Sequence, residues 1–222
     1  MLFRNRVEAG RRLAAELTNY ADRPDVLVLA LPRGGVPVGY EVARALHAPL
    51  DVFLVRKLGV PGRPELAMGA IASGGTRVLN EELLGMLSVP PRRIAEVAQR
   101  EQRELDRRER LYRGSRLPPE IREKTVILVD DGLATGSTMR AAVLALRQLQ
   151  PARIVVAVPV GAKQTCAEFE SEADETICAT TPEPFHAVGA WYDNFDPTSD
   201  DEVRRLLARA SEELRAAVPA AT

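Results

Sequence analysis

The chain has few of the residues from which metal centres and disulfide frameworks are built. Its 222 residues include only two cysteines and two histidines. Two cysteines do not indicate a disulfide framework, and we expect Cys166 and Cys178 to be buried core residues. Because only His47 and His186 could join them as ligands, the sequence does not favour a structural zinc site.

Long apolar runs and a strong net charge are also missing. No apolar stretch reaches the roughly 18 residues that a spanning helix needs, so we expect no membrane segment. The basic residues near the start are not followed by the apolar part of a secretory signal. A net charge of −1 provides no overall attraction to nucleic acid or anionic membranes. These absences predict a cytoplasmic, globular protein.

Apolar runs alternate with amphipathic stretches along the chain. Runs that are apolar on both faces are typical of buried parallel strands, and helical spacing of apolar residues indicates helices between them. The expected strands are 26–31, 50–59, 125–129, 152–161 and 175–180. The expected helices are 5–19, 36–47, 139–149, 163–172 and 200–218. This order predicts a single α/β domain, 1–222, with a doubly wound, mainly parallel sheet flanked by helices.

Three further segments do not fit the alternation. Residues 60–66 contain two prolines and a glycine and are expected to form a loop, and 68–80 a short hairpin. Residues 185–195 are aromatic and are expected to be strand-like or loop-like. Residues 90–113 carry eight arginines and five acids with interleaved signs, which indicates a long, solvated or partner-facing helix. Nucleic-acid binding is the alternative for this helix, but its only aromatic residue is Tyr112, so a stacking platform is not supported.

The main chemical signal is the string VILVDDGLATGST at 126–138. An apolar strand delivers two acids and a small-residue loop to the carboxyl edge of the sheet, where open α/β sheets bind ligands. Free backbone N–H groups at the start of the next helix favour a phosphate, and the acids can accept hydrogen bonds from a sugar diol. An ordinary helix cap is the usual meaning of such a turn, but two acids after an apolar strand are costly without a function. The phosphate-binding candidates are Ala134, Thr135, Gly136, Ser137 and Thr138.

This string resembles the PRPP-binding signature of the type I phosphoribosyltransferases (PRPP is 5-phosphoribosyl-1-pyrophosphate). The resemblance extends over about residues 25–195 and is greatest to a group of stand-alone bacterial proteins. It implies that Asp130 and Asp131 hold the ribose hydroxyls, and that 134–138 hold the 5′-phosphate. It also implies Mg²⁺, which the two acids would hold indirectly through ribose hydroxyls or water. A hood from about 1–20 and 182–198, a helical insertion at 90–113 and a homodimer are further expectations.

Two basic segments fit the pyrophosphate of PRPP. Arg33 offers a planar set of donors and Gly34-Gly35 exposes backbone amides, although an ordinary strand-to-helix turn has the same composition. The family often carries an unusual cis peptide there. Arg56 and Lys57 end the second expected strand, where two cations could stabilise a leaving pyrophosphate.

The remaining candidates concern proton transfer and the acceptor. The loop 60–66 resembles the family's catalytic loop, and Glu65 in it is either a proton-transfer residue or a solvated loop charge. Phe185, Trp191 and Tyr192 offer flat faces on which a base could stack, with core packing as the alternative.

The implied reaction displaces pyrophosphate from C1 of PRPP by a nitrogen nucleophile, most simply a nucleobase. Two other classes remain open: a regulator that senses PRPP without turnover, and a different sugar-phosphate enzyme with the same loop. Ala134 stands where 6-oxopurine-specific relatives commonly carry an acid. This loop is similar to that of adenine enzymes, whereas 32–39 is similar to xanthine-guanine enzymes, so the acceptor stays open.

Overall fold

The centre of the protein is a parallel sheet. The computed structural model describes residues 2–217, and the side chains of all of these except Pro64, Glu65 and Ala217. Five strands lie in the order β2-β1-β6-β7-β8, and every neighbouring pair is parallel. The strands are β1 (Val26–Ala30), β2 (Leu50–Val52), β6 (Thr125–Val129), β7 (Arg153–Val158) and β8 (Glu175–Cys178). The predicted α/β class with a doubly wound, mainly parallel sheet is confirmed.

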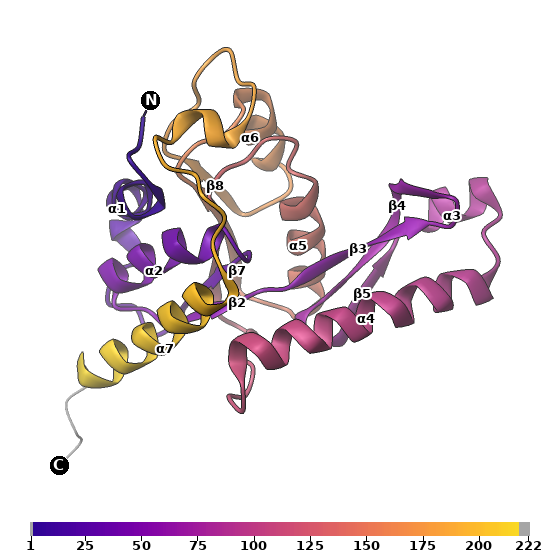
Figure 1. Ribbon diagram of the computed structural model, residues 1–222, viewed down its shortest axis with the longest axis horizontal. Coiled ribbons are helices and arrows are strands. Elements are labelled where there is room, and N and C mark those ends of the chain that lie inside the picture. Colours follow the sequence, from indigo (N-terminus) through magenta and orange to yellow (C-terminus); the bar gives the residue numbers. More distant parts are fainter. Residues whose placement is uncertain (1, 218–222) are drawn as a thin grey trace.

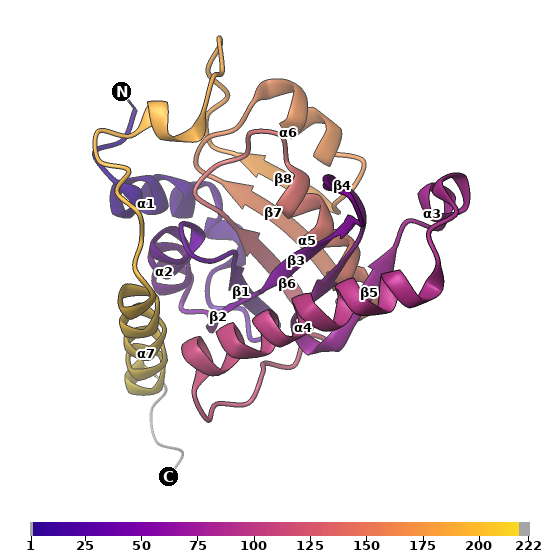
Figure 2. The ribbon, with the colours of Figure 1, turned by 45° about the vertical axis from the view of Figure 1, so that its right-hand side comes forward.

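Helices cover both faces of this sheet (Figures 1 and 2). Alternate residues of β1 enter two separate apolar cores, Val26 and Val28 on one face and Leu27 and Leu29 on the other. The helices of the first face are α1 (Arg6–Glu16), α2 (Gly35–Leu46) and α7 (Asp200–Ala217). Those of the second face are α5 (Ser137–Gln148) and α6 (Lys163–Phe169). The described residues also form two short 3₁₀ turns here, η1 (Thr18–Tyr20) and η3 (Val188–Trp191), and a third between two strands of the sheet described next, η2 (Ser73–Gly75).

A second, antiparallel sheet projects from the core together with two helices, and we call residues 55–113 the arm (Figure 1). Its elements are β3 (Val55–Val60), β4 (Arg63–Ala72), β5 (Thr76–Leu79), α3 (Glu81–Leu87) and α4 (Pro91–Arg113). The strands lie in the order β3-β4-β5. The predicted long helix at 90–113 is confirmed as α4, and it packs on its own chain through Ile94, Ala98 and Leu105, which are buried in the core cluster.

Two predictions about the start of the arm are wrong. The run 50–59 is not one strand, because the chain leaves the parallel sheet after Phe53. The Phe53 N–H still donates to Ala30, whereas the Leu54 N–H donates to Ser73 Oγ in the arm. The run 60–66 is not a loop, because only Pro61 and Gly62 turn between β3 and β4, where Gly62 has a φ of 82°. Apolar composition alone did not distinguish one long strand from two short ones.

A buried ion pair fixes the far end of α4 to the core. Arg113 Nε lies 2.9 Å from Asp51 Oδ2, and its terminal nitrogen donates to the Val52 carbonyl at 2.9 Å. Both side chains are about nine-tenths buried, so removing Arg113 would leave the Asp51 carboxylate buried without its ion-pair partner. Within residues 2–217, no helix combines the length and the apolar character that crossing a bilayer requires.

Candidate functional site

Two adjacent carboxylates lie at the carboxyl end of β6, in the middle of the sheet. Asp130 and Asp131 follow Val129 directly, and Asp130 Oδ1 accepts a hydrogen bond of 2.8 Å from the Asp131 N–H. Asp131 Oδ2 accepts a hydrogen bond of 2.8 Å from Arg6 Nε, which reaches the pair from α1. Arg6 also donates to the Asp196 carbonyl at 2.8 Å. One guanidinium therefore neutralises only part of a two-carboxylate centre.

The environment of this pair disfavours its full ionisation. Burial raises the pKa of Asp130 well above its usual value, and the charge of Asp131 raises it further. Burial also raises the pKa of Asp131, although the hydrogen bond from Arg6 opposes that shift. Such a centre gains stability from any ligand that supplies hydrogen-bond donors or positive charge.

The turn after β1 packs against the acidic pair through its glycines. A Cβ on Gly34 would overlap the Asp131 carboxylate, and one on Gly35 would lie 2.7 Å from the Val129 carbonyl oxygen. The Pro32–Arg33 peptide bond is cis, although Arg33 is not a proline, as expected from the family resemblance. Arg33 itself is half-exposed, 3.8 Å from Asp200 at the start of α7. The structure thus brings the predicted pyrophosphate turn and the predicted ribose acids together.

The predicted phosphate loop ends where α5 begins. Ser137 is the first helical residue, and Gly136 precedes it with a φ of 72°, a conformation that favours glycine. A Cβ there would also lie 2.6 Å from the Phe169 ring. Gly136 is buried, whereas the loop residues with side chains are exposed. These exposed residues are Ala134, Thr135, Ser137 and Thr138. Their backbone therefore opens towards solvent at a helix N-terminus, which is a favourable place for an anion.

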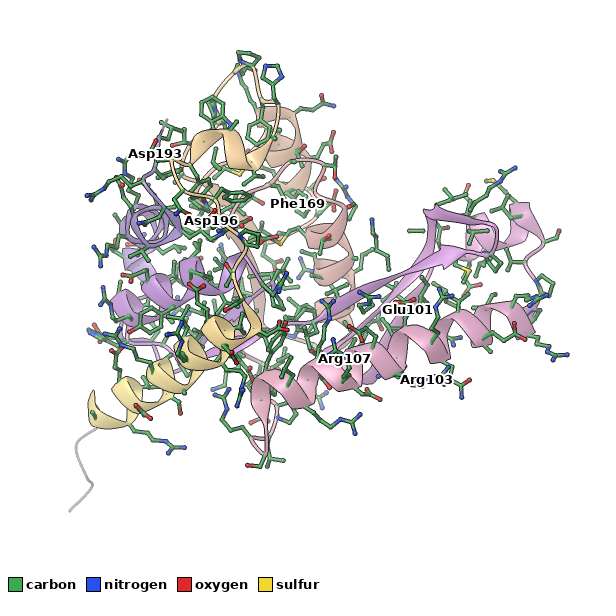
Figure 3. The ribbon with its side chains drawn as sticks, in the orientation of Figure 1. Glu101, Arg103, Arg107, Phe169, Asp193 and Asp196 are labelled. Carbon is green, nitrogen blue, oxygen red and sulfur yellow. A yellow bond between two sulfur atoms is a disulfide. The ribbon has the colours of Figure 1, made fainter. Side chains whose placement is uncertain are left out.

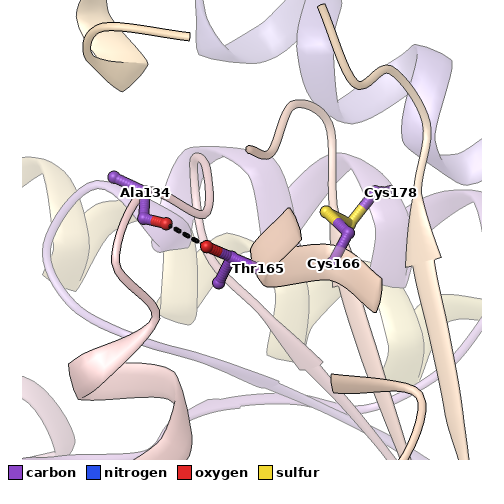
Figure 4. Close-up of a disulfide and its surroundings, with 4 residues drawn as sticks. All are labelled: Ala134, Thr165, Cys166 and Cys178. Carbon is purple, nitrogen blue, oxygen red and sulfur yellow. Dashed lines mark hydrogen bonds between the residues drawn. A yellow bond between two sulfur atoms is a disulfide. The ribbon is translucent and has the colours of Figure 1, made fainter. Parts of the chain in front are cut away.

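A disulfide lies directly behind the phosphate loop, and it overturns our expectation of two separate core cysteines (Figure 4). Cys166 in α6 and Cys178 at the end of β8 are bonded, with their Cα atoms 6.5 Å apart. The adjacent Thr165 Oγ1 donates to the Ala134 carbonyl at 2.7 Å. Both sulfurs lie close to Gly161, and Gly161 forms a β-bridge with Leu133, the residue before the phosphate loop. Sequence reasoning missed this bond because the packing of α6 on β8, not the cysteine spacing, brings the sulfurs together.

The predicted catalytic residues lie on the arm rather than at the edge of the parallel sheet. Arg56 Nε donates to Glu101 Oε2 on α4 at 2.9 Å, so this guanidinium is engaged within the arm. Lys57, the next residue of β3, is exposed. Thr138 of the phosphate loop lines the same cavity as Arg56 and Lys57. Glu65 lies in β4, and its side chain falls outside what the structure describes.

The three predicted base-binding aromatics do not share one environment. The Tyr192 ring is buried between Phe3 and Phe195, with centroids 5.3 and 4.9 Å away. Its hydroxyl donates to the Asp131 carbonyl, and burial and then the charge of Asp131 raise its pKa. Phe185 and Trp191 are half-buried and contact each other, with ring centroids 6.3 Å apart. Tyr192 therefore supports the backbone of the acidic pair from the buried side. Of the three rings, only those of Phe185 and Trp191 offer accessible surface.

Two site residues have no signal in the sequence. Arg6 donates a hydrogen bond to Asp131, which lies 125 positions later in the sequence. Thr165 on α6 donates a hydrogen bond to the phosphate loop. Arginine and threonine are common in amphipathic helices, so neither position could be selected without the tertiary structure. Backbone hydrogen bonds from Leu2 and Phe3 to the Trp191 carbonyl place the start of the chain against the aromatic segment, which brings Arg6 to Asp131.

Comparison with known families agrees with this geometry. The model of the phosphoribosyl transferase domain matches residues 2–193. This chain belongs to the phosphoribosyl transferase domain family. The strand, acidic pair and glycine-containing loop of the site all lie within the matched range.

Relatives support the family assignment over nearly the whole chain. Two Mycobacterium tuberculosis proteins, named provisionally as phosphoribosyl transferases, are 46% identical over 209 residues. The aligned residues make up 94% of this chain but 47% of each relative, so the chain spans about half the length of the curated relatives it matches. A Thermus thermophilus crystal structure is 40% identical, with a TM-score of 0.84, covering 94% of this chain and 99% of that chain.

A more distant structure shares the fold of this phosphoribosyl transferase domain. It is a hypothetical protein from Neisseria gonorrhoeae with bound ppGpp, 15% identical, with a TM-score of 0.51, and 94% of each chain is covered. At that identity the likeness shows the fold alone.

Proposed function

We propose that this domain binds PRPP with Mg²⁺ and transfers its phosphoribosyl group to a nitrogen nucleophile, releasing pyrophosphate. One observation carries the proposal: a carboxylate pair adjoins two glycine-containing turns at the carboxyl edge of the sheet. PRPP has the matching order of groups, a diol between a 5′-phosphate and a pyrophosphate. Membership of the phosphoribosyl transferase domain family supports the same assignment.

In this proposal the loop 134–138 binds the 5′-phosphate through backbone N–H groups and the hydroxyls of Thr135, Ser137 and Thr138. Asp130 and Asp131 accept hydrogen bonds from the ribose hydroxyls, which fixes the sugar with C1 towards the acceptor. The turn at Gly34-Gly35 binds pyrophosphate through its backbone. Glycine is required there because a side chain would occupy the space of the acids.

The residues present fit a divalent cation bound together with the substrate. The acidic pair has two carboxylates and one guanidinium, and burial raises the pKa of both acids. Carboxylate, hydroxyl and phosphate oxygens are the ligands that Mg²⁺ prefers. When bound, Mg²⁺ supplies charge neutralisation for the pyrophosphate leaving group. Asp130 and Asp131 would hold it through ribose hydroxyls or water.

Two protein cations share a role in the leaving-group step, and a third has a structural role. Negative charge accumulates on the pyrophosphate as its bond to C1 breaks, so cations near it lower the barrier. Lys57 in β3 and Arg33 in the pyrophosphate turn are exposed. We assign to both the stabilisation of the leaving pyrophosphate. Arg56 instead fixes the position of β3 against α4 through Glu101. Phe185 and Trp191 would contact the acceptor, while Glu65 remains a candidate for proton transfer.

PRPP sensing without turnover is the second candidate function. One observation favours it: Arg56, one of the two cations expected at the leaving group, already has a carboxylate partner within the arm. A sensor needs the acidic pair and the phosphate loop but no cation that stabilises charge only in the transition state.

The deciding experiment is pyrophosphate release from PRPP and Mg²⁺ with a panel of purines, pyrimidines and simple amines. We expect release with one class of acceptor, and loss of release in Asp130→Asn/Asp131→Asn. The matched control is Asp22→Asn/Asp201→Asn, which removes two exposed carboxylates away from the site and should retain activity. PRPP binding without release for any acceptor would favour the sensor. No PRPP binding by the wild type would reject both functions.

A further inference from the structure

A large cavity lies between the arm's hairpin and α4, beside the candidate site but formed mainly by other residues. Its volume is about 690 Å³, which is within the range of pockets that hold small organic ligands. Strand β3 and the turn at Pro61-Gly62 form one wall, and the first half of α4 forms the other. Thr138 at the start of α5 closes the end nearest the phosphate loop.

The lining of this cavity carries an excess of positive charge. Four cations and two carboxylates line it, which leaves a net charge of two. The cations are Arg56, Lys57, Arg93 and Arg100, and the carboxylates are Glu96 and Glu101. The chain as a whole has a net charge of −1, so this is a local concentration of positive charge. Such a lining favours a ligand with at least two negative charges.

The two α4 arginines retain hydrogen-bonding capacity. Arg93 donates to Glu96 through one terminal nitrogen at 2.9 Å, and Arg100 donates to Glu101 through Nε at 3.0 Å. A guanidinium has five N–H donors, so within the described part of the chain each keeps donors that make no hydrogen bond. Planar guanidinium groups bind phosphate oxygens two at a time. Apolar side chains, Val55, Val60 and Val97, also line the cavity, and they suit an uncharged, flat part of a ligand.

We propose that this cavity is a second ligand site, for a nucleotide with two or more phosphate charges, held by Arg93 and Arg100. The site differs from the one assigned to PRPP in the groups that hold the ligand, because both arginines belong to α4 and neither lies in the phosphate loop or the pyrophosphate turn. It adjoins that site through Thr138 and Lys57. A nucleotide bound there would contact both the hairpin and α4 and hold them at a fixed separation.

The outer face of α4 provides a matched control. Figure 3 shows Glu101 on the side of α4 towards the hairpin and Arg103 on the opposite side. Arg103 and Arg110 are exposed and do not line the cavity, and Arg110 donates to the Asp106 carbonyl rather than to a cavity carboxylate. Removing them takes away the same charge from the same helix without changing the cavity. Arg93 and Arg100 are also mostly exposed, so both double variants should fold, which thermal melting followed by circular dichroism will check.

The test uses ADP as the probe, titrated calorimetrically into protein saturated with PRPP and Mg²⁺, so that the PRPP site is filled. We expect one ADP site per chain in the wild type and in Arg103→Ala/Arg110→Ala, and at least tenfold weaker binding in Arg93→Ala/Arg100→Ala. Inorganic pyrophosphate, which lacks the apolar part, should bind more weakly than ADP.

Three outcomes would overturn the proposal: no ADP binding to the PRPP-saturated wild type, equal affinity in the two double variants, or pyrophosphate binding as tightly as ADP. The result is independent of the proposed transferase function. Asp130→Asn/Asp131→Asn should lose PRPP and keep the ADP site, and if the wild type fails to bind PRPP, the titration of the free protein still tests the cavity.

Discussion

The core site and the arm contribute differently to the same functional centre. In the core, Gly34 and Gly136 let the backbone pack closely against the side chains of Asp131 and Phe169, and the Thr165 hydroxyl bonds a carbonyl of the phosphate loop. On the arm, contacts between charged side chains such as Arg56 and Glu101 determine the arrangement. A covalent bond and close packing position the phosphate loop, whereas ion pairs position the cations. The core should therefore tolerate little change, and the arm should respond to salt and to charge substitution.

The disulfide should give the largest difference between the two regions. Cys166→Ser/Cys178→Ser removes a bond that joins residues 12 positions apart, which corresponds to about 3 kcal/mol of unfolding free energy. Urea denaturation of the oxidised wild type and the double variant measures this loss. We also expect weaker PRPP binding, because Thr165 beside Cys166 supports the loop. A stability unchanged by the substitution or by a dithiol reductant would show that packing alone holds α6 against β8.

Lys57→Ala tests whether the arm contributes chemistry to the core site. If Lys57 acts on the leaving pyrophosphate, kcat should fall by roughly a hundredfold while PRPP affinity changes little. Steady-state kinetics together with equilibrium binding of PRPP separate the two effects. Equal losses in kcat and affinity would mean that Lys57 only binds the ground state.

Two glycine substitutions compare the regions directly. Gly34→Ala places a methyl group in the space of the Asp131 carboxylate, so we expect a loss of about 1–3 kcal/mol in stability and a marked loss of PRPP binding. Gly85→Ala in α3 meets nothing within 4 Å, and alanine favours a helix by up to about 1 kcal/mol. Thermal melting of both variants measures the contrast. A tolerated Gly34→Ala would contradict the close packing of the two turns.

The acidic pair should reduce the stability of the unliganded protein at neutral pH. Burial raises the pKa of Asp130 above its usual value of 3.8, so the folded state binds this proton more tightly than the unfolded chain. The unfolding free energy contributed by this group therefore falls as the pH rises from the pKa of the unfolded chain to the higher pKa of the folded state. Asp130→Asn should be more stable than the wild type at pH 7, because the asparagine side chain carries no charge to bury. The difference should shrink towards pH 4, and urea denaturation at both pH values tests it.

The smallest effect is expected on the surface of the arm. Arg92 is largely exposed and pairs only with Glu96 at a spacing of four residues. Arg92→Ala should change the unfolding free energy by less than about 0.5 kcal/mol, because such pairs contribute little in water. A larger change by the same denaturation assay would mean that α4 makes contacts beyond those within this chain.

Local patterns were sufficient to predict much of the core. The acidic pair, its loop and the helix after it follow each other in the chain, so 126–138 indicated strand, site and helix together. The arm was harder, because its first strand continues the apolar run of β2. Only the long-range contact between Leu54 and Ser73 shows where the chain leaves the parallel sheet.

The rest of the site depends on pairs that are distant in sequence. Arg56 looked like a free cation because Glu101, its partner, is 45 positions away, and Cys166 looked isolated for the same kind of reason. The expected cytoplasmic location stays a prediction, and the disulfide is more typical of oxidising compartments.

The ion pair between Arg6 and Asp131 links two parts of the molecule that a substrate would contact separately. In the proposed complex a sugar hydroxyl would approach Asp131 Oδ2, which already accepts from Arg6, so the two donors would share the charge of that oxygen. Arg6 lies on α1, beside the aromatic segment. Coupling of this kind is reciprocal. If ribose binding weakens the contact of α1 with Asp131 by a given factor, closing that contact weakens ribose binding by the same factor, so the position of the first helix would report on occupancy of the proposed ribose site.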